Sequence, residues 1–313
     1  MEDRGMLGGA HPAAKLILLI ILALVGLFVV MILGLLVAIP FFGQEITGII
    51  LQGEGLDLSE NLNFSRYFQT LSHIGLFVVP SVVFAFLVGR RPFLYLKASH
   101  KPFWVSLGIS ILIMIAALPL VNFLMEINLK LSLPVWMSGL EEWMRTAEEN
   151  AEVVTRMFLE VTSYKALLFN IFMIAVIPAI GEEFIFRGIV LRLFRQWTGS
   201  AHAAVWISAL LFSAMHMQFF GFLPRLFLGL VLGYMLVWSR NIWVPVVAHF
   251  FNNAAAVIFY FMHHNGYINI DIEEVGMGAG SVYYVLTSVV MLAVLSWFFL
   301  NFEKGRQKRL SFD

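Results

Sequence analysis

Long apolar segments alternate with short polar ones along the whole chain. Eight apolar segments can be delimited, at about 14–41, 71–89, 104–126, 166–195, 201–217, 222–238, 243–262 and 281–300. Their apolar residues run on continuously and approach the ~20 residues that a helix needs to cross a bilayer, unlike the alternating ~10-residue strands of an outer-membrane barrel. The pattern predicts an all-α integral membrane protein, a bundle of about eight transmembrane helices.

Composition supports the membrane assignment and limits the chemistry. Hydrophobic residues make up 60% and charged residues 13% of the 313-residue chain, whereas a soluble domain is only ~45–50% apolar. Cysteine is absent, which excludes disulfides, thiolate metal sites and cysteine nucleophiles. The net charge is zero, so nucleic acid is not an expected partner. The sequence shows no low-complexity linker, so residues 1–313 are predicted to form a single polytopic membrane domain.

The distribution of basic residues predicts the orientation of the bundle. If both termini are cytoplasmic, most of the 20 Lys and Arg residues fall on the cytoplasmic side. These are Arg4, Lys15, Arg90, Arg91, Lys97, Lys101, Arg187, Arg192, Arg195, Arg240, Lys304, Arg306, Lys308 and Arg309. Cytoplasmic loops of membrane proteins carry such an excess. We therefore expect an even number of spans, cytoplasmic termini and, as location, a bacterial plasma membrane.

The segment at about 128–164, predicted to lie outside, has the pattern of an amphipathic helix. Its apolar residues recur every three or four positions, at Leu140, Trp143, Met144, Ala147, Ala151, Val154, Phe158 and Val161, and the opposite face is acidic. The helix is either a cap that guides substrate over the bundle or an interfacial helix that lies on the membrane surface. The pattern alone favours the interfacial helix.

Polar residues interrupt three of the apolar segments. Glu182 and Glu183 follow IPAIG, His216 lies in LLFSAMHMQFF, and His249 and Asn253 lie in VPVVAHFFNN. Ionisable residues at membrane depth are costly and mark functional sites by default. Together these residues predict one intramembrane catalytic site in a polar cavity.

Helical spacing assigns different surroundings to the two glutamates. Residues four apart share a helix face, which places Glu183 one turn from Arg187 and His249 one turn from Asn253. Glu182 points about 100° away from Glu183. We therefore expect Glu183 and Arg187 to form a supporting ion pair, and Glu182 to face the bundle interior as a general base.

The turn after the fourth segment allows the depths of these residues to be compared. Glu182 lies seventeen residues before Gly199 and His216 lies seventeen after it. An antiparallel hairpin would therefore place both side chains at one level, ~25 Å from the turn. His249 lies nine residues beyond Arg240, ~13 Å along its helix, which agrees if the hairpin projects into the cytoplasm.

Three motifs in this order resemble a known family. The patterns Glu182-Glu183-x-x-x-Arg187, Phe212-x-x-x-His216 and His249-x-x-x-Asn253 are similar to those of the CAAX protease and bacteriocin-processing family of intramembrane peptidases, which includes type II CAAX prenyl endopeptidases. The motif-bearing region covers about 166–262.

The resemblance implies an intramembrane endopeptidase, an eight-helix bundle with its cavity open toward the cytoplasm. The position that matches Glu182 would activate a water molecule with help from the one that matches His216. His249 and Asn253 would stabilise the oxyanion, which requires N–H donors aimed at the developing charge. The partners would then be a peptide or membrane-protein substrate and the lipid bilayer.

Metal dependence is left open by these residues. Glu182, His216 and His249 could hold a divalent metal such as zinc with one open position for water, and the same residues can also act without metal. No His-Glu-x-x-His sequence is present. We slightly prefer the metal-independent mechanism.

Other functions and other residues remain to be weighed. A non-proteolytic membrane scaffold or bacteriocin-immunity protein could use the same fold. A transporter is a less attractive alternative, because no inverted repeat is visible in the sequence. Serine and aspartyl intramembrane proteases are excluded, because no Gly-x-Ser-Gly occurs and the only aspartates, Asp3, Asp57, Asp271 and Asp313, fall outside the predicted spans. His73 is interpreted as a residue at a span end without a catalytic role.

Overall fold

The structure, a computed structural model, describes residues 5–47, 61–269, 275–278 and 280–310. No strand occurs among these residues, so the predicted all-α fold class is confirmed. The helices are α1 (Pro12–Thr47), α2 (Leu62–His73), α3 (Val79–Gly89), α4 (Pro92–Tyr95), α5 (Trp104–Leu129), α6 (Ser138–Leu159), α7 (Tyr164–Asn170), α8 (Ile177–Glu183), α9 (Leu191–Thr198), α10 (Ala201–Met215), α11 (Phe222–Ser239), α12 (Trp243–His264) and α13 (Val282–Leu310). The π-helical turns η2 (Ile74–Val78), η4 (Ile171–Val176) and η5 (Phe184–Val190) join some of them, and η3 (Val135–Met137) and η6 (Phe219–Gly221) are 3₁₀ turns.

Seven continuous helices in the described residues are long and apolar enough to cross a membrane. They are Pro12–Gly43, Leu62–Gly89, Trp104–Leu129, Tyr164–Thr198, Phe219–Ser239, Trp243–His264 and Val282–Lys308. The eighth apolar helix, α10, has 15 residues and is shorter than the ~20 that a span needs. A bundle of about eight helices is thus confirmed. The four aspartates lie outside the described residues.

The second spanning helix begins earlier than its hydropathy predicts. The apolar pattern placed its start near residue 71, whereas α2 begins at Leu62. Asn61 caps the helix, because its side-chain oxygen accepts hydrogen bonds from the backbone N–H groups of Asn63 and Phe64, each at 3.1 Å. The added turns are polar and bring Gln69 into the body of the bundle.

The helix that carries Glu182 and Glu183 contains two π-helical turns. Helices α7, α8 and α9 form one continuous run, interrupted by η4 just before α8 and by η5 just after it. Such turns are rare and occur frequently at functional sites. The run ends at Gly199, whose φ of 69° is left-handed and is most easily adopted by glycine. The predicted turn is therefore present.

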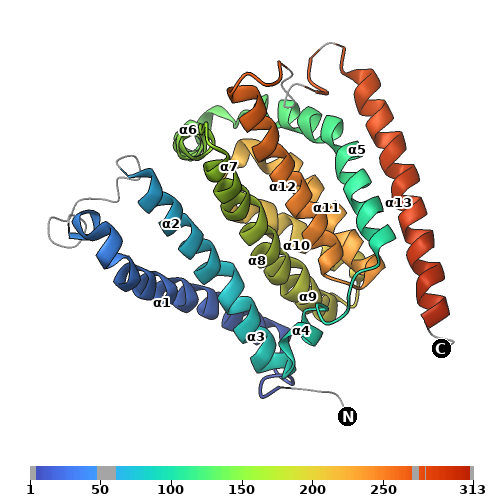
Figure 1. Cartoon of the computed structure of the whole chain (residues 1–313). Helices are drawn as coiled ribbons and strands as arrows, with labels where there is room; N and C mark the ends of the chain where they lie inside the picture. Colours follow the sequence, from blue (N-terminus) through green and yellow to red (C-terminus); the bar gives the residue numbers. More distant parts are fainter. Residues whose placement is uncertain (1–4, 48–60, 270–274, 279, 311–313) are drawn as a thin grey trace.

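Two apolar clusters hold the bundle together. In Figure 1, α1 to α3 lie on one side, α8 to α12 in the centre, and α5 with α13 on the other side. One cluster joins α1, α3, α4 and the α8–α9 run to α10 and α12, and includes Phe212. The other joins α5, α11, α12 and α13, and includes Met114 and Leu232. A cavity lies between the clusters, since these three side chains line it.

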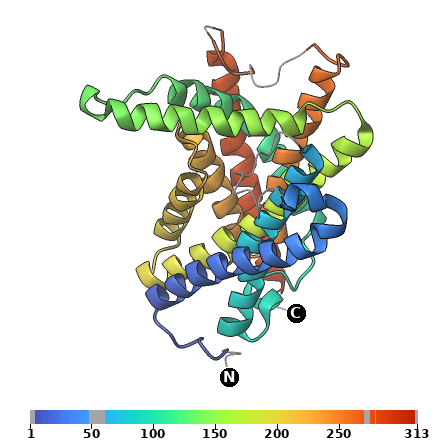
Figure 2. The ribbon, with the colours of Figure 1, turned by 90° about the vertical axis from the view of Figure 1, so that its left-hand side faces the viewer.

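Helix α6 lies across one end of the bundle. It runs over the end opposite the two termini (Figures 1 and 2). Its first half projects, with Leu140 43% and Trp143 50% exposed, whereas Phe158 near its end is only 5% exposed. Phe158 and Thr155 line the cavity. The second half of α6 therefore forms part of the cavity wall, as a cap would. The sequence pattern alone had favoured an interfacial helix.

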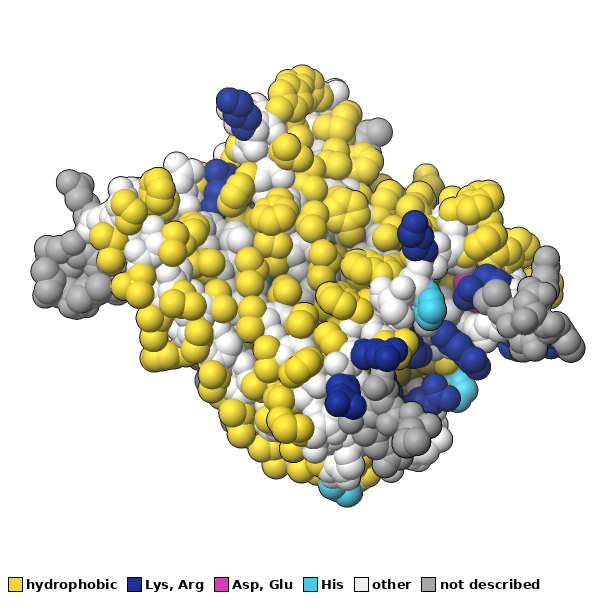
Figure 3. Space-filling view, turned by 60° about the horizontal axis from the view of Figure 1, so that its bottom comes forward, with side chains coloured by type: hydrophobic (Ala, Val, Ile, Leu, Met, Phe, Trp, Pro, Cys, Tyr) yellow, Lys and Arg dark blue, Asp and Glu magenta, His cyan; other side chains and the backbone are white. Residues whose placement is uncertain are grey.

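Basic side chains gather at the end of the molecule that carries the termini (Figure 3). Burial, followed by the charges of Arg195, Arg192 and Arg240, lowers the pKa of Lys97 in the α4–α5 loop to about 8. The three arginines thus lie close enough to Lys97 to repel its charge. Their grouping at one end agrees with the asymmetry of Lys and Arg in the sequence.

Candidate active site

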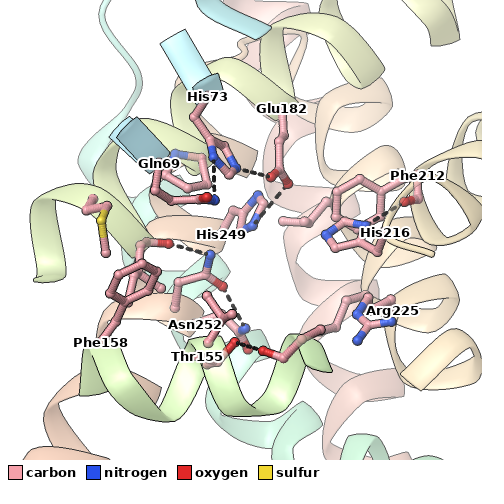
Figure 4. Close-up of a pocket in the computed structure, with 18 of the residues that line it drawn as sticks. Gln69, His73, Thr155, Phe158, Glu182, Phe212, His216, Arg225, His249 and Asn252 are labelled. Atoms are coloured by element: carbon pink, nitrogen blue, oxygen red, sulfur yellow. Dashed lines mark hydrogen bonds and ion pairs between the residues drawn. The ribbon is translucent and has the colours of Figure 1, made fainter. Parts of the chain in front are cut away.

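Four polar residues of the three motifs meet at one cavity. It has a volume of about 700 Å³ and is lined from α2, α5, α6, α8, α10, α11 and α12 (Figure 4). The four predicted catalytic residues, Glu182, His216, His249 and Asn253, all line it. Its volume falls in the range typical of ligand pockets, ~300–1,000 Å³. The tertiary fold therefore joins residues that are up to 71 positions apart, from Glu182 to Asn253.

Glu183 is fully buried beside this cavity and is held by two partners. One carboxylate oxygen lies 2.9 Å from a terminal nitrogen of Arg187 and 2.9 Å from Nδ1 of His249. The predicted i,i+4 pair with Arg187 is thus present. The contact with His249 was not predicted, because it joins two helices.

Arg187 makes further contacts that fix its position. It donates a hydrogen bond of 3.2 Å to the backbone oxygen of Gly229 on α11. Its guanidinium also lies 4.5 Å from the centre of the Phe212 ring on α10, a cation–π distance. Only 1% of its side chain is exposed. Arg187 therefore links η5 to α10 and α11.

His249 lies between the two glutamates. Its Nδ1 contacts Glu183, and its Nε2 lies 3.9 Å from Oε2 of Glu182. Because Glu183 as a carboxylate can only accept, Nδ1 carries the proton in that contact and Nε2 is directed to the cavity side. Nε2 can donate a hydrogen bond as well only when both ring nitrogens carry a proton.

Glu182 has a second histidine partner that the sequence interpretation missed. His73 Nε2 lies 3.6 Å from Oε1 of Glu182, and the amide nitrogen of Gln69 lies 3.3 Å from His73 Nδ1. Figure 4 shows this row of side chains at the cavity wall. His73 is not at the end of a span, since the helix starts at Leu62. The signal available in the sequence was the i,i+4 spacing of Gln69 and His73.

His216 and Asn253 each use part of their hydrogen-bonding capacity on nearby backbone. Nδ1 of His216 lies 2.8 Å from the backbone oxygen of Phe212, one turn earlier on its own helix. Asn253 donates to the backbone oxygen of Ile174 at 3.2 Å, and its oxygen accepts from Asn252 at 3.3 Å. Among the described residues, His216 Nε2 and the second N–H of the Asn253 amide have no such bond and remain for a bound molecule.

Metal binding is a separate question for these residues. No group of three or more His, Asp or Glu side chains in the described part of the chain has the geometry to hold a metal ion. His249 Nδ1 contacts Glu183, and His249 Nε2 lies 3.9 Å from Glu182, whereas two ligands of one zinc ion, each ~2.0–2.2 Å from it, lie roughly 3.5 Å apart. The metal set of Glu182, His216 and His249 stays a prediction, and no step below passes through a metal.

The central part of the chain matches a known family. Residues 164–255 match the family model described as type II CAAX prenyl endopeptidase, Rce1-like. The chain carries an Rce1-like segment. The resemblance read from the three motifs is thus confirmed.

Curated relatives share the same part of the protein. The chain is similar to the uncharacterized protein YpbD of Bacillus subtilis (strain 168), with 28% identity over 89 residues, 27% of this chain and 42% of that protein. It is also similar to the membrane-embedded CAAX protease MroQ of Staphylococcus aureus (strain USA300), with 29% identity over 99 residues, 30% of this chain and 40% of that protein. The chain thus spans less than half the length of the relatives it matches. No solved structure gives a significant match.

We predict that the Arg187–Glu183 pair stabilises the bundle. Arg187→Met should lower the free energy of unfolding in detergent by ~3–5 kcal/mol, because it leaves a buried carboxylate without its cation. The double variant Arg187→Met/Glu183→Gln should recover part of this loss. Thermal unfolding of the purified variants measures both effects.

The exposed i,i+4 pair of Arg156 and Glu152, whose side chains are 62% and 57% exposed, is the matched control. Arg156→Met should leave the melting temperature unchanged, since exposed pairs contribute little. Wild-type stability of Arg187→Met would contradict the supporting role of this pair.

Proposed function

We propose that the protein is an intramembrane endopeptidase in which Glu182 is the general base. The observation that carries the proposal is the different placement of the two adjacent glutamates. Glu183 is turned away from the cavity and is occupied by Arg187 and His249. Glu182 lines the cavity between His73 and His249. A carboxylate held beside a cavity but not neutralised by an arginine is suited to accept a proton.

The proposed reaction uses the groups that face the cavity. A water molecule between Glu182 and His216 gives its proton to Glu182, and its oxygen attacks the carbonyl carbon of the scissile bond. The negative charge that develops on the carbonyl oxygen is stabilised by N–H groups of His249 and Asn253. The carbon–nitrogen bond then breaks as Glu182 returns the proton to the leaving amine.

His73 extends the site beyond the Rce1-like segment. It contacts the Glu182 oxygen that does not face His249, and Gln69 holds its other ring nitrogen. Two histidines on opposite oxygens restrict the rotation of the carboxylate. We assign His73 a positioning role for the base.

The proposal also gives the bundle an orientation. We propose that both termini and the basic end are cytoplasmic, so that α6 and the part of the cavity that it lines face the other side of the membrane. This differs from the cavity open toward the cytoplasm that the family resemblance implied, because α6 lies opposite the termini. Residues 1–313 would form one domain, with 166–262 as its catalytic core and 128–164 as its external segment.

Replacing the base tests the activity. Glu182→Gln keeps the shape of the side chain and removes its ability to accept a proton, so turnover should fall by at least ~10²-fold. Cleavage of a set of apolar peptides by protein purified in detergent, followed by mass spectrometry, measures this. Glu152→Gln on the exposed face of α6 is the control and should cleave as the wild type does. Near-wild-type cleavage by Glu182→Gln would rule out the assignment.

The oxyanion assignment makes a separate prediction. His249→Ala and Asn253→Ala should each lower turnover by ~10²–10³-fold with little change in substrate binding, the usual effect of losing one donor. The wild type should keep its activity after exhaustive chelation. Loss of bound metal on His249 substitution, together with restoration of the chelated wild type by zinc, would instead show a metal-ligand role.

The orientation can be tested with single cysteines, because the native chain has none. Asn150→Cys on α6 and Ser99→Cys in the α4–α5 loop both replace exposed residues. An impermeant thiol reagent applied to right-side-out vesicles should label Asn150→Cys and spare Ser99→Cys, and inside-out vesicles should give the opposite result. Labelling of Asn150→Cys from the cytoplasmic side would reverse the topology.

A further inference from the structure

The cavity has a cation in its wall that the three motifs do not include. Arg225, near the start of α11, lines the cavity on the same side as His216 (Figure 4). It donates hydrogen bonds to the backbone oxygen of Gln218 at 2.7 Å and to the side-chain oxygen of Gln218 at 2.6 Å. Both partners are neutral amide oxygens. These two hydrogen bonds therefore hold Arg225 in place without neutralising its charge.

No described carboxylate forms an ion pair with Arg225 within 4.0 Å. The acidic groups that act on it are Glu148 and Glu182. Glu148 accepts a hydrogen bond of 3.3 Å from the backbone N–H of Phe220, and Glu182 is bound by His73 and His249. Each acid is thus engaged elsewhere.

The guanidinium retains donors for a further partner. Arginine has five N–H groups, and the two bonds to Gln218 use one on each terminal nitrogen. The N–H groups that remain include a parallel pair in the plane of the guanidinium. A carboxylate suits such a pair, because its two oxygens can accept two parallel hydrogen bonds. A partly desolvated cation binds such an anion more strongly than an exposed one does.

The rest of the cavity wall defines the chemistry of the ligand. Half of the side chains that line the cavity are apolar, among them Met114, Ile174, Leu228 and Leu232. A ligand that fits it carries apolar groups along its length and one anionic group. If this ligand is a peptide, its anion is a carboxylate.

We propose that Arg225 binds a carboxylate of the substrate peptide and thereby selects the bond that reaches Glu182. This inference rests on the proposed protease function and adds the substrate class, an apolar peptide with a carboxylate near the cleaved bond. The carboxylate is either the peptide's own carboxyl terminus or an acidic side chain. In both cases the contact is made by one arginine at the edge of the site.

Binding can be measured without cleavage in the Glu182→Gln background. The probes are fluorescein-labelled nonapeptides of Ala and Leu that end in a free carboxylate or in an amide, and amide-ended peptides with one internal Glu or Gln. Fluorescence anisotropy should show binding about ten- to hundred-fold tighter for the charged member of one pair, the scale of a charge-assisted hydrogen bond. The pair that shows the preference identifies the source of the carboxylate.

Adding Arg225→Gln should remove this preference, whereas Arg225→Lys should keep part of it. Gln218→Ala is the matched control, because it removes a hydrogen bond to Arg225 but not the charge. It should retain the preference for the charged peptide. Thermal unfolding of each variant shows whether the stability of the fold is retained.

Three results would overturn the inference: equal binding of charged and neutral peptides, a preference that survives Arg225→Gln, or a Gln218→Ala variant that matches Arg225→Gln in both binding and melting temperature. The last would show that Arg225 only supports the turn. Failure of the proposed protease function gives a different result from failure of the Arg225 inference, because the wild type would then bind these peptides without cutting any of them.

Discussion

The buried charge of Glu183 is the constraint around which the centre of the bundle is arranged. Its side chain is fully buried, and an isolated carboxylate in such a place is costly by several kcal/mol. Arg187 and His249 compensate it with contacts of 2.9 Å. Since Arg187 also reaches the backbone of α11 and the ring of Phe212, one acidic group fixes the mutual positions of α8, α10, α11 and α12.

This arrangement also explains why two adjacent glutamates can serve different purposes. A step of one residue turns a side chain by about 100° around a helix, so Glu182 enters the cavity when Glu183 is directed into the protein. The π-helical turns η4 and η5 flank the pair and locally change the rotation of the helix. His249 contacts both acids, which couples the supporting network to the cavity.

The parts of the chain outside the Rce1-like segment complete the cavity. Residues 164–255 contain the four predicted catalytic residues, but His73 and Gln69 come from α2, and Thr155 and Phe158 come from α6. These elements supply the second histidine beside Glu182 and one wall of the cavity. The amino-terminal half of the chain therefore contributes to the surroundings of Glu182.

The sequence by itself determined the helical membrane fold, because continuous apolar segments of about 20 residues have few other stable arrangements in a bilayer. It also determined the Glu183–Arg187 pair, which follows from helix periodicity alone. Only the tertiary structure decided the partners of Glu182 and Glu183 on other helices, His73 and His249, and the place of α6 over the cavity. Periodicity shows which residues share a helix face, but the rotation and depth of one helix against another result from packing over the whole bundle.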